Sequence, residues 1–224
     1  VKNKMQLHKV FKKGDFIIVR DEKSAWLLDA LEIPCSQIPD LAFLYRPEET
    51  PEKMPEKKRV GISLRGGFFG DNESDIPKIH DYLAEKWYDP IFLVHTTEWY
   101  ESQNDLLFTR RVMQGKKYNI TNSIEQTLKL YPTLYAVVGM RLHSGILAVT
   151  HGLPLIMVSY GPKTDEFVNL VDMKWYSLPP HELSLESFVK LWEDLEKHYE
   201  FMKSTAMERR ETIRADLIKK LRTL

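Results

Sequence analysis

The segment from Leu134 to Ala148 reads LYAVVGMRLHSGILA and indicates the fold of the whole chain. Its first six residues form an apolar run typical of a strand buried in a parallel sheet, and a helix is expected over 143–150. Arg141 and His143 then fall at the carboxyl end of the strand, where open α/β sheets bind ligands. An anion is the expected ligand, because a helix start, an Arg fork and a titratable His all favour one. The structural alternative is that Arg141 pairs with a neighbouring carboxylate and His143 caps the helix.

The same arrangement recurs at the next predicted strand. Residues 154–158 form a second apolar run, and Ser159-Tyr160-Gly161-Pro162-Lys163 follows it. Sequential strands usually lie side by side, so Lys163 is expected to face the same crevice as His143. The alternative for this lysine is a solvated surface charge. Two successive strand-to-helix connections therefore carry cationic or titratable side chains.

Strands and helices alternate from Arg59 onwards. The first strand, 60–64, is followed by Arg65-Gly66-Gly67, where the glycine pair lets a ligand approach the backbone or simply forms the turn. A further strand is predicted at 90–94, and helices at 74–87, 101–112, 124–130, 165–171 and from 184 to 221 with a bend near 203–204. This alternation predicts an α/β fold with a doubly wound, parallel, Rossmann-like sheet covered on both faces.

The residues before this region differ in pattern. Residues 1–45 contain a predicted strand at 16–20, a helix capped by Asp21, and a loop with a short extended segment at 39–44. Residues 46–58 carry three prolines and many charges, which is typical of a linker. We therefore expect a strand–helix segment at 1–45, a linker at 46–58 and a ligand-binding lobe with long C-terminal helices at 59–224. The chain does not begin with Met, so a fragment or a trimmed product is expected.

The composition argues against several classes of function. The 32 Lys and Arg residues equal the 32 Asp and Glu residues, so nothing indicates nucleic-acid binding. Cys35 is the single cysteine, which excludes an internal disulfide framework and fits a reducing cytoplasm. No apolar stretch approaches the length of a membrane span. The sequence lacks the phosphate-loop, dinucleotide and nucleophile-elbow motifs, and its histidines lack a zinc-binding spacing, so we expect no metal.

Several segments together resemble the polysaccharide pyruvyl transferase family. Its C-terminal signature is similar to Gly139-Met140-Arg141-Leu142-His143-Ser144, then His151-Gly152-Leu153-Pro154, and then Ser159-Tyr160-Gly161-Pro162-Lys163. Upstream, Ile18-Val19-Arg20-Asp21-Glu22-Lys23-Ser24 and Pro39-Asp40-Leu41-Ala42-Phe43 resemble two further family segments. The order and spacing agree from Phe16 to about Phe167. Leu41 and Gly161 depart from the pattern, since the family has Pro and often Asp there, and the family's early Gly-Asp segment is absent.

The resemblance implies transfer of pyruvate from phosphoenolpyruvate to a sugar of a cell-surface polysaccharide or its lipid-linked precursor, as a ketal. It implies a GT-B-type C-terminal lobe with a remnant of the N-terminal lobe, and no cofactor beside the donor substrate. On this hypothesis His143 and Arg141 are catalytic, with His143 as general acid/base, and Arg65, Ser144, Tyr160 and Lys163 bind substrate. A cytoplasmic location is expected, with a place at the inner face of the membrane and a homo-oligomer as further options.

Two other hypotheses stay open. The first is a GT-B-type glycosyltransferase whose nucleotide-sugar diphosphate occupies the same helix start. The second is a non-catalytic, truncated member of the family that binds an anionic ligand, or a partner chain that supplies the missing lobe.

Overall fold

The structure is a computed structural model of the chain, and it describes residues 6, 9–11, 16–47, 54–100 and 103–223. The chain divides into two compact units, one formed by residues 1–45 with 211–224 and the other by residues 46–210. The second unit contains the large sheet and every predicted site residue. Part of the predicted linker, 48–53, lies outside the described residues.

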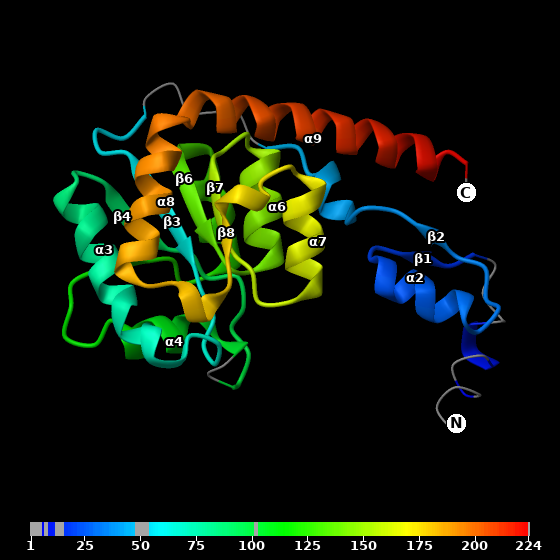
Figure 1. Cartoon of the computed structure of the whole chain (residues 1–224), viewed down its shortest axis with the longest axis horizontal. Helices are drawn as coiled ribbons and strands as arrows, with labels where there is room; N and C mark the ends of the chain where they lie inside the picture. The colour runs from blue at the N-terminus through cyan, green and yellow to red at the C-terminus, as the bar shows by residue number, and fades with distance from the viewer. Residues whose placement is uncertain (1–5, 7–8, 12–15, 48–53, 101–102, 224) are drawn as a thin grey trace. The chain divides into compact units, whose positions relative to one another are not determined.

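Six parallel strands form the sheet of the second unit, in the order β5-β4-β3-β6-β7-β8 (Figure 1). They are β3 (Arg59–Ser63), β4 (Asp89–Phe92), β5 (Asn119–Ile120), β6 (Leu134–Gly139), β7 (Leu155–Val158) and β8 (Ser177–Leu178). Apolar residues dominate the central strands, and β7 is buried along its whole length, as expected for a strand covered on both faces. The predicted fold class, α/β with a doubly wound parallel sheet, is confirmed.

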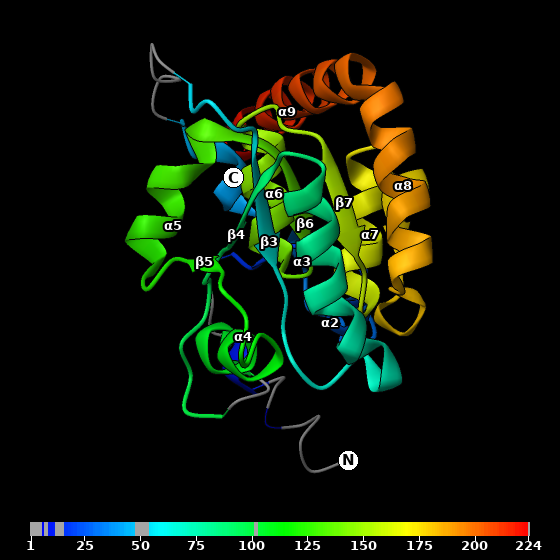
Figure 2. The same ribbon diagram turned by 90° about the vertical axis from the view of Figure 1, so that its left-hand side faces the viewer.

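The strand order reverses between β3 and β6. From β3 the chain runs outward through β4 to β5, and it then returns to β6 and runs outward through β7 to β8 (Figure 2). The two central strands pair directly, with Gly61 opposite Val137. Open α/β sheets bind ligands outside the carboxyl ends of their strands at such a reversal. Arg65 and Arg141 follow the two strands that meet there.

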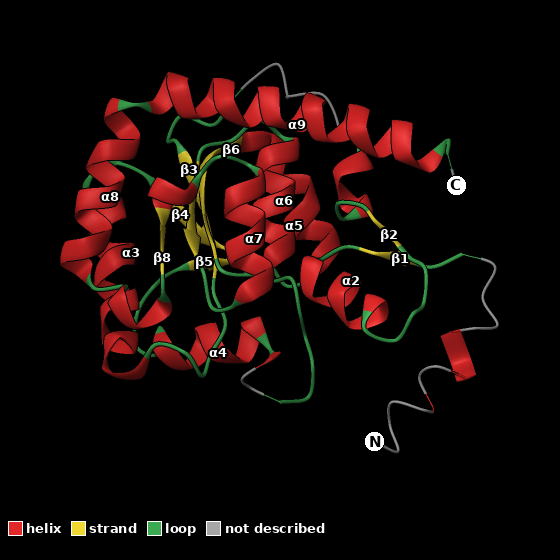
Figure 3. Ribbon diagram, turned by 45° about the vertical axis from the view of Figure 1, so that its right-hand side comes forward, coloured by secondary structure: helices red, strands yellow, loops and turns green. Residues whose placement is uncertain are grey.

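Helices cover both faces of this sheet. They are α3 (Ile76–Glu85), α4 (Asp105–Val112), α5 (Ile124–Leu130), α6 (Leu142–Thr150), α7 (Pro162–Leu170), α8 (Leu185–Lys197) and the first part of α9 (Tyr199–Leu221). Figure 3 shows α3 and α8 on one side of the sheet and α5, α6 and α7 on the other. The apolar face predicted from Phe188 and Trp192 is in the core, where the two rings stack with centroids 5.8 Å apart. Within the described ranges, no helix is long and apolar enough to cross a membrane.

Two local predictions were wrong, and two short strands of the large sheet were missed. The two-residue strands β5 and β8 were not predicted, because runs this short leave no periodicity in the sequence. The long helical pattern is interrupted at His198, the C-cap of α8, and not near residues 203–204. Leu41–Leu44 is a 3-10 helix and not an extended segment, because the Asp40 side chain accepts a hydrogen bond from the N–H of Ala42 at 3.0 Å.

The first unit is small. Strands β1 (Ile18–Val19) and β2 (Ser36–Gln37) pair in parallel, and α2 (Glu22–Asp29) begins at Asp21, whose carboxylate accepts from the N–H of Ser24 at 2.8 Å as predicted. Arg214 of α9 donates from Nε to the carbonyl oxygen of Phe43 at 2.9 Å. This contact explains why residues 211–224 group with residues 1–45, although the sequence analysis had assigned them to the lobe at 59–224. The interpretation of this unit as a remnant of an N-terminal lobe stays a prediction.

Candidate functional site

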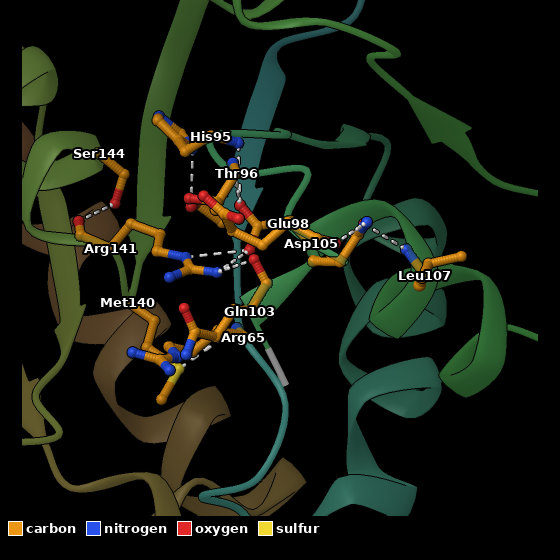
Figure 4. Close-up of polar contacts among 12 residues, drawn as sticks. Arg65, His95, Thr96, Glu98, Gln103, Asp105, Leu107, Met140, Arg141 and Ser144 are labelled. Carbon is orange, nitrogen blue, oxygen red and sulfur yellow. Dashed lines mark hydrogen bonds and ion pairs between the residues drawn. The ribbon is translucent and has the colours of Figure 1, made fainter. Parts of the chain in front are cut away.

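Polar side chains follow four neighbouring strands of the sheet where each strand ends. Arg65 lies just beyond β3, His95 beyond β4, Arg141 beyond β6 and Tyr160 beyond β7. Because the strands are parallel, these residues share one edge of the sheet, and Figure 4 shows Arg65, His95 and Arg141 together there. The two central strand ends are also in contact, since the backbone N–H of Arg65 donates to the side-chain sulfur of Met140 at 3.4 Å.

Arg141 forms a buried ion pair with Asp105 of α4. Its Nε and Nη2 atoms donate to the same carboxylate oxygen at 3.0 and 2.5 Å, and Nη2 also donates to the carbonyl oxygen of Gln103 at 3.2 Å (Figure 4). The side chains are 13% exposed for Arg141 and 2% for Asp105. The structural alternative for this arginine, pairing with a carboxylate, is therefore present. It fixes the guanidinium in one orientation.

Asp105 also organises the loop that follows β4. Its second carboxylate oxygen accepts from the N–H groups of His95 and Thr96 at 2.9 and 3.0 Å. The preceding residue, Asn104, caps α4 by accepting from the N–H of Leu107 at 3.0 Å, and so holds the start of the helix in place. Burial raises the pKa of the Asp105 carboxyl, and Arg141 together with the two N–H groups opposes that rise. One acidic residue thus connects the ends of β4 and β6.

His95 lies at the centre of a chain of hydrogen bonds beneath the site. Its Nδ1 atom is 3.0 Å from the hydroxyl of Ser63, the last residue of β3, and its Nε2 atom is 3.0 Å from the hydroxyl of Tyr131. The Tyr131 hydroxyl donates to the carbonyl oxygen of Ser144 in α6. It therefore accepts from Nε2–H of His95, and Nδ1 accepts from Ser63. This series of hydrogen bonds connects the ends of β3 and β4 to the first turn of α6.

This imidazole is held in its neutral form. Burial, together with the charges of Arg141 and His143, lowers the pKa of His95 from 6.5 to about 4, and a hydrogen bond with the backbone of Leu93 opposes this shift only in part. Tyr131, its hydrogen-bond partner, is fully buried, and burial raises the pKa of that phenol well above its ordinary value. Both groups are consequently uncharged at neutral pH, and we assign them a positioning role.

The first turn of α6 carries the two other predicted residues of this segment. His143 is exposed, and it lies close enough to His95 to affect the pKa of that ring. Ser144 is fully buried, and its hydroxyl donates to the carbonyl oxygen of Arg141 at 2.6 Å. Arg141 is the N-cap residue and makes no side-chain cap of its own, so the start of α6 presents its dipole to the edge of the sheet. The predicted substrate contact of Ser144 stays a prediction, and its observed contact is within the helix start.

The remaining predicted residues form a cluster around Tyr160, made of Arg65, Phe68, Tyr160 and Lys163. The Arg65 guanidinium carbon lies 5.1 Å from the centre of the Tyr160 ring and 4.9 Å from that of Phe68. The Lys163 ammonium lies 5.5 Å from the Tyr160 ring centre. Burial would raise the pKa of Tyr160, but hydrogen bonds and charge from Lys163 and Arg65 lower it overall. The structure thus brings together the predicted residues that follow β3 and β7.

His95 and Asp105 were not among the predicted site residues. A signal for His95 was available, because it directly follows the apolar run 90–94, as Arg65 and Arg141 follow theirs. Asp105 gave no such signal, since it pairs with a residue 36 positions away. Across the described residues, no group of three or more His, Cys, Asp or Glu side chains is arranged to hold a metal ion. The expectation that no metal is required stays a prediction.

Comparison with solved structures agrees with the fold. The chain is similar to TarM, with 15% identity and a TM-score of 0.50, over 98% of this chain and 43% of TarM. It also matches the accessory secretory proteins 1, 2 and 3 of Streptococcus pneumoniae (16% identity, 99% of this chain and 46% of that one, TM-score 0.46). A third match is the glycosyltransferase SnogD from Streptomyces nogalater (10% identity, 85% and 55%, TM-score 0.45). The chain spans about half the length of these structures, and the likeness to TarM agrees with the predicted α/β fold of its lobe.

The amino-acid sequence itself matches a family model. A search of curated proteins gives no match. The model of the polysaccharide pyruvyl transferase family matches residues 2–162, which is well over half of the chain. The match includes β3, β4 and β6, the start of α6 and the end of β7, and so most of the site described above. The chain belongs to the polysaccharide pyruvyl transferase family.

Proposed function

We propose that this chain binds phosphoenolpyruvate at the carboxyl edge of its sheet and transfers the pyruvyl group to a saccharide as a ketal. Family membership supports a transferase that acts on polysaccharides. The observation that carries the proposal is the grouping of cationic side chains from three strand ends. Arg65 and Lys163 both lie against the Tyr160 ring, and Arg141 lies near Arg65 at the same edge of the sheet (Figure 4). Phosphoenolpyruvate bears a phosphate and a carboxylate, and such a dianionic ligand needs several cationic partners at one place.

Arg141 suits the role of an anion clamp because Asp105 already fixes it. Two of its nitrogens are engaged by the ion pair, whereas Nη1 makes no hydrogen bond within the part of the chain that the structure describes. A guanidinium held in one orientation loses little entropy when it binds a ligand. The start of α6 adds backbone N–H groups and a favourable dipole for the same anion.

His143 is the proposed general acid. It donates a proton to the methylene carbon of phosphoenolpyruvate, and the adjacent carbon becomes electrophilic. A saccharide hydroxyl then adds to this carbon and returns a proton to His143, and phosphate leaves with the electrons of the C–O bond. A second hydroxyl of the saccharide adds to the same carbon and closes the ketal, and its proton goes to the released phosphate. The proposed role fits an exposed histidine at the start of α6, because imidazole is the side chain that most often serves as a general acid in enzymes. His95 stays neutral below it and positions the start of α6.

The remaining parts of the proposal follow from the donor and acceptor. Phosphoenolpyruvate is a substrate, and the chemistry asks for no resident cofactor or metal. The acceptor is a saccharide on a polysaccharide or a lipid-linked precursor. We propose a cytoplasmic protein that works beside the inner face of the membrane, with a homo-oligomer or a partner chain as its assembly.

Isothermal calorimetry with phosphoenolpyruvate tests the proposal. The wild-type chain should bind it, and Lys163→Ala should weaken binding about tenfold, because a lost charge-assisted contact costs roughly 1.5 kcal/mol or more. Lys203→Ala is the matched control, since Lys203 is an exposed lysine on α9 and its loss should leave binding unchanged. His143→Gln should bind phosphoenolpyruvate within about threefold of wild type and release no phosphate when a saccharide acceptor is added.

Two results would contradict the proposal. Binding of UDP-glucose without binding of phosphoenolpyruvate would indicate a glycosyltransferase that uses a nucleotide sugar. Binding of neither compound would indicate a member of the family that does not catalyse the reaction on its own.

A further inference from the structure

A cavity of about 380 Å³ lies beside the edge strand β8, outside the site described so far. Polar side chains line it from the end of β7, from α7, and from β8 and the segment before it, namely Ser159, Asp165, Asn169, Lys174 and Ser177. Val168 and Leu178 add apolar surface. The volume is near the lower end of the roughly 300–1,000 Å³ typical of small-molecule sites, so the cavity suits a ligand with one or two rings.

The polar groups of this cavity are available to a ligand. Among the described residues, the side chains of Asn169, Lys174 and Ser177 make no hydrogen bond or ion pair within the protein. One carboxylate oxygen of Asp165 accepts from the hydroxyl of Ser159, and the other has no partner in that part of the chain. The cavity therefore presents an ammonium, an amide, a hydroxyl and a carboxylate oxygen, which are donors and acceptors in one small space.

The charges of the cavity lining indicate which kind of ligand fits. Lys174 and Asp165 carry one positive and one negative charge, so the lining is balanced and an anion gains little there. A ligand with several hydroxyls can donate and accept at once, and it satisfies all of these groups without carrying charge. The apolar side chains Val168 and Leu178 can pack against the C–H face of a sugar ring. Trp175, which follows Lys174, is 86% exposed and offers a ring face on the nearby surface.

We infer that this cavity binds a neutral pyranose unit of the saccharide acceptor, an inference that rests on the proposed function. Its place in the fold supports this assignment. Ser159 directly precedes Tyr160, and Asp165 lies two residues after Lys163 in the first turn of α7. The cavity therefore shares the end of β7 and the first turn of α7 with the cationic cluster proposed for phosphoenolpyruvate. The cavity is an acceptor subsite on the same unit as the donor site.

Saturation-transfer NMR of the full chain with methyl β-D-glucopyranoside, methyl β-D-galactopyranoside and methyl β-D-mannopyranoside tests the inference. At least one of these sugars should receive magnetisation from the wild-type protein. The double variant Asn169→Ala with Lys174→Ala should raise the dissociation constant about tenfold or more, because two hydrogen-bonding partners are lost. The matched control is Asn122→Ala with Lys203→Ala, two exposed residues of the same types away from the cavity lining, which should bind as wild type does.

A titration of the same variants with phosphoenolpyruvate separates this inference from the proposed function. The cavity variant should bind phosphoenolpyruvate as the wild type does. Sugar binding that depends on the cavity residues, without phosphoenolpyruvate binding, would support the saccharide site and overturn the proposed donor. No transfer to any of the three sugars, or equal transfer to the cavity variant, would overturn the inference. Ser177→Ala, a milder change, provides a second test if circular dichroism shows the double variant to be misfolded.

Discussion

Replacing His95 with Gln removes a titratable ring from the hydrogen-bond chain beneath the site, and the consequence for stability can be worked out from the structure. The ring lies between Ser63 and Tyr131, and the charged or titratable groups that lower its pKa are Arg141 and His143. Burial disfavours a charge on the ring more strongly than its hydrogen bond with the backbone of Leu93 favours one. The folded protein therefore resists protonation of this residue.

The sign and size of the effect follow from the two pKa values. The pKa of His95 is about 4 in the folded protein and 6.5 when the ring is exposed, so the unfolded chain binds the proton more tightly. The contribution to stability is complete above about pH 6.5 and is lost as the pH falls toward 4. Integrated from pH 7 to pH 5, this difference lowers the free energy of unfolding by about 2 kcal/mol, which is large for a single residue.

Urea unfolding at pH 7 and pH 5 measures the effect, followed by circular dichroism and tryptophan fluorescence. Carboxylates titrate over the same interval, but they are shared by both proteins and cancel when wild type is compared with His95→Gln. The wild type should lose about 2 kcal/mol more than the variant between the two pH values. His181→Gln is the matched control, because His181 is 72% exposed, and it should lose as much as the wild type does.

Equal losses for wild type and His95→Gln would refute this reasoning. Such a result would mean that the His95 ring binds a proton in the folded protein as readily as in the unfolded one. The hydrogen bonds that run from Ser63 through His95 and Tyr131 to Ser144 would then not keep the ring neutral. An NMR titration of the ring C–H signals gives an independent answer. A His95 midpoint above pH 6 would refute the reasoning in the same way.

Two further predictions concern the elements that support the site. Asp105→Asn leaves the buried guanidinium of Arg141 without its carboxylate and should lower the free energy of unfolding in urea by roughly 3–5 kcal/mol. The control Glu73→Gln breaks an exposed ion pair and should lower it by at most about 1 kcal/mol. Gly145→Ala puts a Cβ 2.5 Å from a buried aromatic ring of α7 and should lower the free energy of unfolding by about 1–3 kcal/mol, measured by thermal unfolding. The control is Gly161→Ala, whose added Cβ has no neighbouring atom within 4 Å and should leave stability nearly unchanged. Equal costs within either pair would contradict the packing described here.

The sequence was sufficient to predict the elements whose patterns are local. Residues 134–139 and 124–130 form a strand and a helix with the predicted bounds, because a continuous apolar run and a capped amphipathic segment each determine their own structure. The predicted side chains at strand ends, Arg65, Arg141 and Tyr160, could be placed on one edge of the sheet for a related reason. Parallel strands put all their carboxyl ends on the same side, whatever the strand order is.

The partners of these side chains could not be predicted in the same way. Asp105 lies in a helix whose predicted start, residue 101, falls outside the described residues, and nothing near it in the sequence points to Arg141. The Tyr131 hydroxyl meets His95 across 36 positions of chain. Such contacts depend on the order of the strands and on their register. The hydrophobic pattern does not encode either of these for a sheet with both faces buried.

Arg141 was expected either to pair with a neighbouring carboxylate or to bind an anionic ligand, and its ion pair with Asp105 makes these two roles compatible. A paired arginine is normally counted as structural, because its charge is neutralised. Here the carboxylate holds Nε and Nη2, and it also accepts from two N–H groups of the loop after β4, so the guanidinium cannot rotate. Nη1 is left on the side away from the pair. A ligand anion is then met by a donor that is already oriented, which is the condition under which a buried charge contributes most to binding. The pairing is therefore an argument for the anion site and not against it.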